Sequence, residues 1–128
     1  MPKWNEYVEQ ARDRGNLALE LFTVESTPCA SPAELKETLP EHLEYQNAQE
    51  AAGALVMAGP LSDDTGDLME GAGLIVYRAT SLEDARKIAD ADPMHAKGRR
   101  TYRLRRWLVN EGCLEFTVKL SQQSAKLH

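Results

Sequence analysis

The segment GLIVYRATSLEDARKIADADP, residues 73–93, carries the strongest structural signals in the chain. Residues 73–79 are dense in apolar and β-branched types, which predicts a buried strand. Ser81 then supplies a helix N-cap, and apolar residues at helical spacing follow it. The helix is expected to end where Asp92 precedes Pro93, because proline continues a helix poorly. One short segment therefore predicts a strand that leads directly into a helix.

Further strands and helices are predicted on both sides of this segment. Residues 3–14 place apolar side chains on one helical face, and residues 17–25 are apolar on both faces, as in a central strand. The sequence Ser31-Pro32-Ala33-Glu34 signals another helix start, with a capping serine and a proline at the first helical position. The remaining expected elements are strands over 55–59, 101–109 and 114–120, a connecting loop over 60–72, and frayed residues 121–128.

Pro40 predicts an interruption in the helix that begins at Ser31. Proline lacks the N–H that a helix interior needs, and the residues around it repeat a helix-start signal. We therefore expect a second helix from about residue 39 to Gly53. His42 would then lie in the first turn of that helix, where the dipole favours a neutral imidazole.

The predicted order is strand, helix, strand, strand, helix, strand, once the terminal additions are set aside. This is the ferredoxin-like split β-α-β arrangement of the α+β class, in which an antiparallel sheet carries both helices on one face. The other face needs a cover, and a second copy of the chain is the simplest one. We therefore expect a homodimer through the sheet face, an interface to which the strand over 114–120 could contribute.

Length and composition predict one soluble globular domain over residues 1–128. The core is expected over about 17–112, with an N-terminal helix in 1–16 and a C-terminal strand and tail in 113–128. The chain is 42% hydrophobic and 27% charged, and it has no long apolar run. The polar start lacks the pattern of a secretory signal, so a cytoplasmic location is expected, away from membranes.

The charge distribution makes nucleic acid the least favoured partner. The formal net charge is −5, which repels phosphate backbones, although a basic strip occupies residues 97–106. That strip lacks the interleaved aromatic residues of a nucleic-acid-binding face. The arginines either coat the solvent side of a strand or attract a small anionic ligand.

His42 and Asp92 are the candidates for chemistry that the residue types alone suggest. A neutral imidazole is a general base, and it needs an acceptor to orient its second nitrogen. Asp92 could be that acceptor, but an aspartate before a proline is also a standard helix cap. Neither Cys29 nor Cys113 has a partner pattern, no metal-binding spacing occurs, and no cofactor motif is present.

Four stretches in order along the chain resemble the YCII-related domain family. They are LPEHLEYQ (39–46), AGPLSDDTG (58–66), the segment 73–93 and RRWLVNEG (105–112). The resemblance implies a ferredoxin-like protomer in a dimeric α+β barrel. It also implies that His42 and Asp92 form a paired active site, because they match the family's histidine and aspartate elements.

These observations lead to the hypothesis of a small lyase or isomerase without a cofactor. His42 would remove a proton from a small anionic cyclic substrate, and Asp92 would orient His42. Arg106 would hold the substrate's carboxylate. Gly59 and Pro60 would line the pocket, and His95 is also assigned to substrate binding, although its position alone favours solvent.

The alternative is a non-catalytic dimeric module that binds a small molecule or assists another enzyme. In that interpretation His42 and Asp92 are a structural hydrogen-bonded pair, and their loss costs stability and no reaction. The two residues are fifty positions apart, so no local pattern decides whether they meet.

Overall fold

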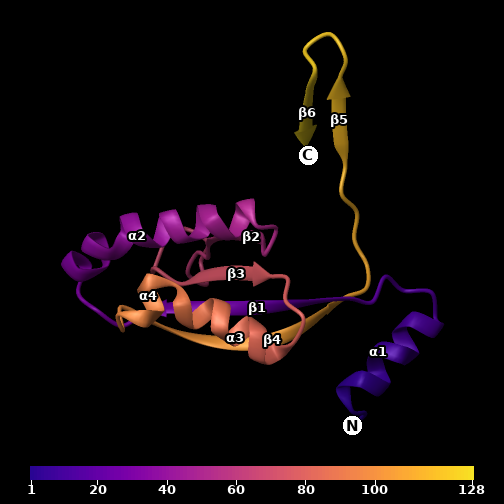
Figure 1. Ribbon diagram of the computed structural model, residues 1–128, viewed down its shortest axis with the longest axis horizontal. Coiled ribbons are helices and arrows are strands. Elements are labelled where there is room, and N and C mark those ends of the chain that lie inside the picture. Colours follow the sequence, from indigo (N-terminus) through magenta and orange to yellow (C-terminus); the bar gives the residue numbers. More distant parts are fainter. The chain divides into compact units, whose positions relative to one another are not determined.

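A computed structural model describes all residues, 1–128. The elements in chain order are α1 (Trp4–Asp13), β1 (Leu19–Pro28), α2 (Pro32–Ala51), β2 (Leu55–Pro60), β3 (Gly73–Tyr77), α3 (Leu82–Ala91), α4 (Pro93–Ala96), β4 (Arg100–Val109), β5 (Phe116–Lys119) and β6 (Ser124–Leu127) (Figure 1). Helix α3 begins as predicted, because the Ser81 hydroxyl accepts a hydrogen bond from the Asp84 amide at 3.1 Å. None of the helices has the length and apolar character that a membrane span requires.

The main sheet has four strands in the order β2-β3-β1-β4. Strands β1 and β3 pair antiparallel with Val24 opposite Ile75, and β2 pairs antiparallel with β3. Between β1 and β4 the chain runs through α2, two strands and α3, so the predicted ferredoxin-like order is confirmed. The fold is α+β with an antiparallel sheet.

The core lies between this sheet and helix α3. Val24, Ile75 and Tyr77 point from one sheet face and pack with Ala89 of α3. Because side chains alternate across a strand, their neighbours in sequence point to the other sheet face. Helix α2 contacts β2 and α4, which places it beside α3 over the same sheet (Figure 1).

Helix α2 runs through Pro40 without ending, so the prediction of two separate helices was wrong. Its start is a capping box, in which the Ser31 hydroxyl accepts from the Glu34 amide and the Glu34 carboxylate accepts from the Ser31 amide, each at 3.2 Å. Pro40 removes one backbone donor from the helix. Contacts with α4 and β2 hold the helix on both sides of that point. His42 therefore lies in the middle of α2, and the argument from the helix dipole does not apply to it.

The C-terminal residues are ordered as a hairpin, so the prediction of frayed residues 121–128 was wrong. Strands β5 and β6 pair antiparallel, with Phe116 opposite Leu127. The alternation of apolar and polar residues resumes in β6 after a turn in which Gln123 has a φ of 48°. The strand predicted over 114–120 therefore belongs to a separate two-stranded sheet.

The chain divides into two compact units. Residues 20–107 contain most of the main sheet and helices α2, α3 and α4. Residues 1–19 together with 108–128 contain α1 and the β5–β6 hairpin. Within this second unit the Leu17 amide donates to the Asn110 carbonyl at 3.3 Å, which fixes the chain just after β4.

Tyr77 is a buried core residue whose hydroxyl lacks a hydrogen-bond partner. A buried polar group without a partner costs free energy, so Tyr77→Phe is expected to raise the free energy of unfolding by about 1 kcal/mol at pH 7. Urea unfolding of both proteins measures this difference. A loss of stability on substitution would contradict the burial cost.

The same substitution is expected to change how stability depends on alkaline pH. Burial raises the pKa of Tyr77, and the charge of Asp92 raises it further. The folded chain therefore keeps a proton that the unfolded chain releases above about pH 10, so stability falls as the pH rises beyond that value. Tyr77→Phe should make this decline shallower. An equal decline in the wild type and the variant would show that Tyr77 does not cause the loss of stability at alkaline pH.

Candidate active site

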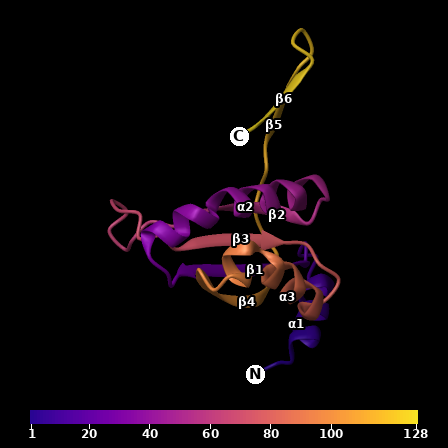
Figure 2. The same cartoon turned by 60° about the vertical axis from the view of Figure 1, so that its left-hand side comes forward.

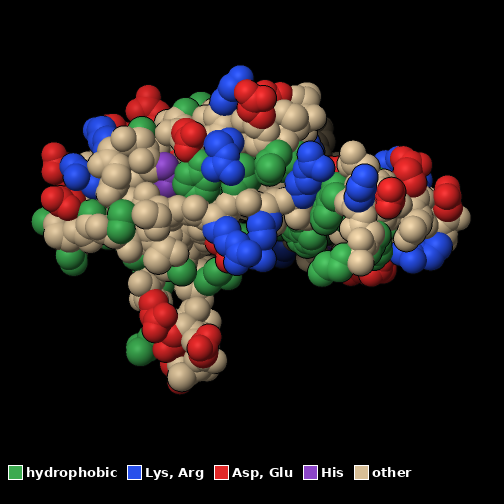
Figure 3. Space-filling view, turned by 90° about the horizontal axis from the view of Figure 1, so that it is seen from below, with side chains coloured by type: hydrophobic (Ala, Val, Ile, Leu, Met, Phe, Trp, Pro, Cys, Tyr) green, Lys and Arg blue, Asp and Glu red, His purple; other side chains and the backbone are tan.

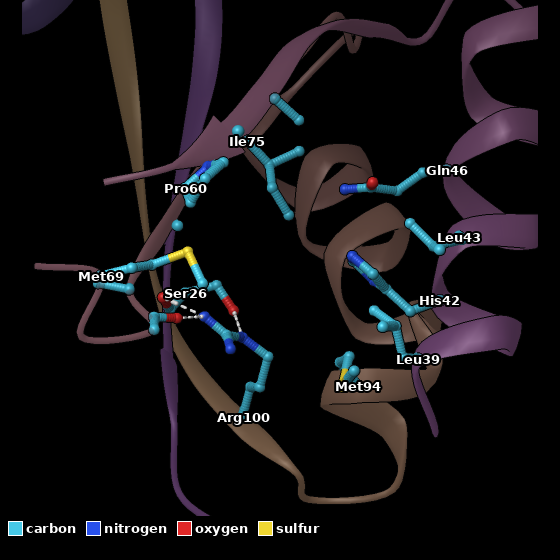
Figure 4. A pocket seen from close by; sticks show the side chains of 15 residues that line it. Ser26, Leu39, His42, Leu43, Gln46, Pro60, Met69, Ile75, Met94 and Arg100 are labelled. Carbon is cyan, nitrogen blue, oxygen red and sulfur yellow. Dashed lines mark hydrogen bonds between the residues drawn. The ribbon is translucent and has the colours of Figure 1, made fainter. Parts of the chain in front are cut away.

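A cavity of about 370 Å³ lies against α2, and strands from both halves of the split fold line it (Figure 4). The size is that of a pocket for a small molecule. Its lining is mainly apolar, with four polar side chains, those of Ser26, His42, Gln46 and Arg100. The other lining residues are Leu39, Leu43, Ala58, Gly59, Pro60, Met69, Gly71, Ala72, Gly73, Ile75 and Met94.

His42 and Asp92 meet in the structure. The imidazole Nδ1 lies 2.8 Å from Oδ1 and 2.9 Å from Oδ2 of the carboxylate. A carboxylate only accepts hydrogen bonds, so Nδ1 carries the proton and Nε2 is the bare nitrogen of the neutral ring. The His42 side chain extends from α2 toward the cavity (Figure 4). The geometry thus presents Nε2 as an acceptor to whatever occupies the cavity.

Asp92 also caps a helix, so one carboxylate both contacts His42 and holds the start of α4. Its Oδ1 accepts a hydrogen bond from the Met94 amide at 3.0 Å, at the start of α4, where Pro93 takes the first helical position. The side chain is fully buried between these partners. A carboxylate has room for both bonds because its two oxygens offer several acceptor sites.

The buried charge of Asp92 acts on phenols around it. The pKa of Tyr45 is raised, first by burial and then by the Asp92 carboxylate. The Tyr45 hydroxyl donates to the Ile88 carbonyl at 2.6 Å, which links α2 to α3 beside the His42–Asp92 pair. Both effects keep Tyr45 protonated and hold α2 in register with α3.

Arg100 is fixed across the cavity from His42 by hydrogen bonds to β1 and the loop before β3. Its Nε donates to the Ser26 hydroxyl and one Nη donates to the Ser26 carbonyl, both at 2.8 Å (Figure 4). The same Nη also donates to the Gly71 carbonyl. Burial lowers the pKa of Arg100, but a guanidinium remains cationic in proteins. The second Nη is not used in these bonds and can bind an anion in the cavity.

His95 supports this arrangement from behind Ser26 and does not line the cavity. Its Nδ1 lies 2.8 Å from the Ala89 carbonyl, which only accepts, so Nδ1 carries the proton. Its Nε2, 2.8 Å from the Ser26 Oγ, therefore accepts from the hydroxyl in the neutral ring. His95 thus orients Ser26, which in turn orients Arg100. No group of three His, Cys, Asp or Glu side chains is arranged to hold a metal ion.

The structure brings together some of the predicted site residues and leaves others apart. Gly59 and Pro60 line the same cavity as His42. Arg106 lies away from the cavity lining, where its Nε is 3.4 Å from a Glu20 carboxylate oxygen. Arg100 occupies the position that the sequence hypothesis gave to Arg106. Both arginines point to the same face of β4, and the sequence does not show which end of that strand reaches the cavity.

Most cations of the basic strip are paired with carboxylates. The pairs are Lys97 with Glu41 at 2.8 Å, Arg99 with Glu34 at 4.0 Å, Arg105 with Glu25, and Arg106 with Glu20. Lys and Arg side chains gather along the middle of the face shown in Figure 3, with acidic side chains among them. Pairing reduces the field that this strip offers to a large polyanion.

Comparison with known proteins places these features in a family. The family model of the YCII-related domain matches residues 18–108. The uncharacterized protein YjpA of Bacillus subtilis (strain 168) is 36% identical over 76 residues, which cover 59% of this chain and 82% of that protein.

A solved structure shares the fold. The 5-chloro-2-hydroxyhydroquinone dehydrochlorinase TftG of Burkholderia phenoliruptrix AC1100, in complex with 2,5-dihydroxybenzoquinone, superposes with a TM-score of 0.54 at 18% identity. The match covers 68% of this chain and 92% of that one. At this identity the similarity shows the fold and leaves the chemistry open.

Proposed function

The chain belongs to the YCII-related domain family, and from this premise we propose that it is a small lyase or isomerase that acts on an anionic cyclic compound. His42 Nε2 acts as the general base and Asp92 orients the ring. The observation that carries the proposal is the His42 Nδ1 contact with both oxygens of a fully buried carboxylate, beside a cavity that His42 lines.

The pairing supports base catalysis because it prepares the charge that proton transfer creates. When Nε2 takes a proton from the substrate, the imidazole becomes a cation while Nδ1 still donates to Asp92. The carboxylate stabilises that cation at a contact distance already present before the reaction. The proton then either returns to another substrate atom, which is an isomerisation, or remains while a neighbouring bond breaks, which is an elimination.

The cavity walls support a cyclic anion as the substrate class. The apolar side chains of Leu39, Leu43 and Ile75 suit the faces of a ring, and Arg100 offers a cation on the opposite side from His42 (Figure 4). A carboxylate or ionised hydroxyl on the ring would pair with Arg100. The structure of the dehydrochlorinase that shares the fold is a complex with 2,5-dihydroxybenzoquinone, a cyclic hydroxy compound. That ligand agrees with the proposed class of substrate.

The proposed assembly is a homodimer through the sheet face opposite α2 and α3, in the cytoplasm. That face includes Met57 and Trp107, which are 56% and 42% exposed in the single chain. Apolar side chains on an open sheet face favour burial against another copy. Cys29 and Cys113 are both free and exposed, as expected in a reducing compartment.

Hydrogen–deuterium exchange on candidate substrates tests the proposed reaction. Small cyclic hydroxy and carboxylate compounds would be incubated with the protein in D2O and followed by NMR. Base removal of a carbon-bound proton should replace one substrate proton by deuterium or form an eliminated product. Binding of these compounds without exchange or turnover would contradict the proposed enzymatic function.

Replacing Arg100 by glutamine is expected to weaken the binding of an anionic ring compound by about 10- to 100-fold, because a charge-assisted hydrogen bond is lost. Isothermal titration calorimetry with 2,5-dihydroxybenzoquinone as the first probe measures the dissociation constant. Arg86→Gln is the matched control, because Arg86 is an exposed residue of α3 that does not line the cavity. Equal affinities for the Arg100 and Arg86 variants would show that Arg100 does not bind the anionic ligand.

A non-catalytic binding module is the second candidate. The observation that favours it is the second role of Asp92, whose bond to the Met94 amide stabilises α4 whether or not a reaction occurs. This candidate predicts ligand binding with no chemical change, together with a loss of stability when the pair is broken.

A further inference from the structure

Ser26 carries a buried hydroxyl that the proposed proton transfer does not use. The residue is 3% exposed, yet it lines the cavity on the other side from His42 (Figure 4). Strand β1 places Ser26 next to β4, and helix α3 packs over these strands (Figure 2). Its partner in the register of β1 and β3 is Gly73. Because opposite residues share a face of the sheet and Gly73 has no side chain, β3 leaves the space beside the Ser26 hydroxyl free.

His95 is arranged as a base for this hydroxyl. Its Nε2 lies 2.8 Å from the Ser26 Oγ, and its Nδ1 lies 2.8 Å from the Ala89 carbonyl oxygen. Because a carbonyl only accepts hydrogen bonds, Nδ1 carries the proton and the bare Nε2 accepts from the hydroxyl in the neutral ring. The ring of Tyr102 lies beside the imidazole, with the two centroids 4.7 Å apart. A hydroxyl within hydrogen-bond reach of a base, which a third group orients, is the arrangement of an activated nucleophile.

The surroundings of the pair favour the charges that proton transfer from Ser26 to His95 creates. Ala89 belongs to the last turn of α3, and the negative end of the helix dipole stabilises a cationic imidazole there. On the other side of Ser26, the Arg100 Nε donates to the Oγ at 2.8 Å. A cation at that distance stabilises negative charge on the oxygen. Ser26 thus lies between an oriented base and a fixed positive charge.

We infer that Ser26 is a nucleophile and that the chain hydrolyses small esters through an acyl-enzyme intermediate, with His95 as the base. This activity goes beyond the proposed function, because neither His42 nor Asp92 takes part in it. The cavity, of about 370 Å³, is large enough for a small ester, and its mainly apolar lining suits an uncharged acyl group.

The reaction needs water as its only co-reactant. The Ser26 Oγ attacks the carbonyl carbon of the ester while the His95 Nε2 takes the hydroxyl proton. The bond from that carbon to the alcohol oxygen then breaks, and His95 gives the proton to the departing alcohol. In the second half His95 takes a proton from water, and the hydroxide attacks the acyl carbon. The Oγ leaves with the proton from His95, which releases the carboxylic acid and restores Ser26.

Labelling of the full chain with phenylmethylsulfonyl fluoride tests the inference. The reagent joins its sulfonyl group to an activated serine oxygen and releases fluoride, so it reports the nucleophile before any substrate is known. Intact-protein mass spectrometry should show one label per chain, and peptide mapping should place it on Ser26. An unlabelled wild type, or a label on another residue, would overturn the inference. This result does not depend on the folding of any variant.

Replacing Ser26 by alanine should abolish the labelling. Ser62→Ala is the matched control, because it removes an exposed serine from the segment between β2 and β3, and it should be labelled like the wild type. Circular dichroism checks that both variants are folded. Hydrolysis of 4-nitrophenyl acetate, followed by the absorbance of nitrophenolate, should fall in Ser26→Ala to the rate without protein. A labelled Ser26 in a wild type that hydrolyses this ester no faster than Ser26→Ala would refute the hydrolysis.

Replacing His95 by glutamine should slow both the labelling and the hydrolysis by about 100-fold or more, because the general base is lost. His128→Gln is the matched control, because His128 is an exposed histidine outside the cavity, and its rates should equal those of the wild type. Equal rates for the two histidine variants would show that His95 is not the base.

The measurements separate this inference from the proposed function. If Ser26 is not labelled while cyclic substrates exchange protons in D2O, only the nucleophile is refuted. If Ser26 is labelled and the ester is hydrolysed while no cyclic compound exchanges a proton, the hydrolase is supported and the lyase or isomerase is not.

Discussion

Replacing Asp92 by asparagine is expected to reverse the tautomer of His42 and to lower turnover on the order of 10⁴-fold. The carboxylate accepts from Nδ1 through both oxygens, at 2.8 and 2.9 Å. An asparagine amide can instead donate to Nδ1, which moves the ring proton to Nε2. A protonated Nε2 cannot take a proton from the substrate. Asparagine is also a good N-cap, so α4 should keep its bond from the Met94 amide.

Nitrogen-15 NMR of the imidazole rings measures the tautomer directly, before any substrate is known. The wild type should show a protonated Nδ1 at His42, and Asp92→Asn should show a protonated Nε2. Asp64→Asn is the matched control, because Asp64 is an exposed carboxylate in the loop 61–72. If His42 keeps one tautomer in all three proteins, Asp92 acts as a cap alone and the proposed orientation is wrong.

The sequence predicts the framework of the fold because the decisive signals are local. The capping serines at Ser31 and Ser81 act on amides three residues away, so their effect can be recognised without the tertiary structure. The signal of Pro40 is also local, and it led to the wrong prediction of a break in α2. Its local cost is real, but contacts of α2 with α4 and β2 come from distant parts of the chain and outweigh it. The hairpin was missed because Gln123 gives no conventional turn signal.

The site is predicted less completely because it is built from distant residues. Residue types offered Asp92 only as one possible acceptor for His42, and the family resemblance implied that the two are paired. No periodicity could join residues from α2 and the start of α4. Arg100 was missed in favour of Arg106, although a cation on that face of β4 was expected. Ser26 was missed too, because a serine inside an apolar strand reads as an ordinary strand residue. Only the packing of β1 against β4 reveals that Ser26 and His95 hold Arg100.

Replacing His42 by alanine is expected to abolish turnover while the protein stays folded. General-base catalysis contributes about 10²–10⁴-fold, so loss of Nε2 should remove most of the rate. The substitution also leaves Asp92 with the Met94 amide as its remaining bond, which costs about 1–3 kcal/mol of stability. Domains of this size are stable by roughly 5–15 kcal/mol, so the fold should survive this loss. Exchange of substrate protons in D2O measures the rate, and circular dichroism confirms the fold.

Added imidazole separates the catalytic role of His42 from a structural one. The alanine variant leaves a space beside the cavity where free imidazole can bind and accept the proton. If His42 is the base, imidazole should restore part of the rate in His42→Ala. It should restore none in a His42→Ala variant that also carries Asp92→Asn, because the carboxylate no longer orients the added ring. Full turnover by His42→Ala without imidazole would move the base elsewhere in the cavity. Ser26 would then be the first alternative, because it lines the cavity and its hydroxyl is hydrogen-bonded to His95.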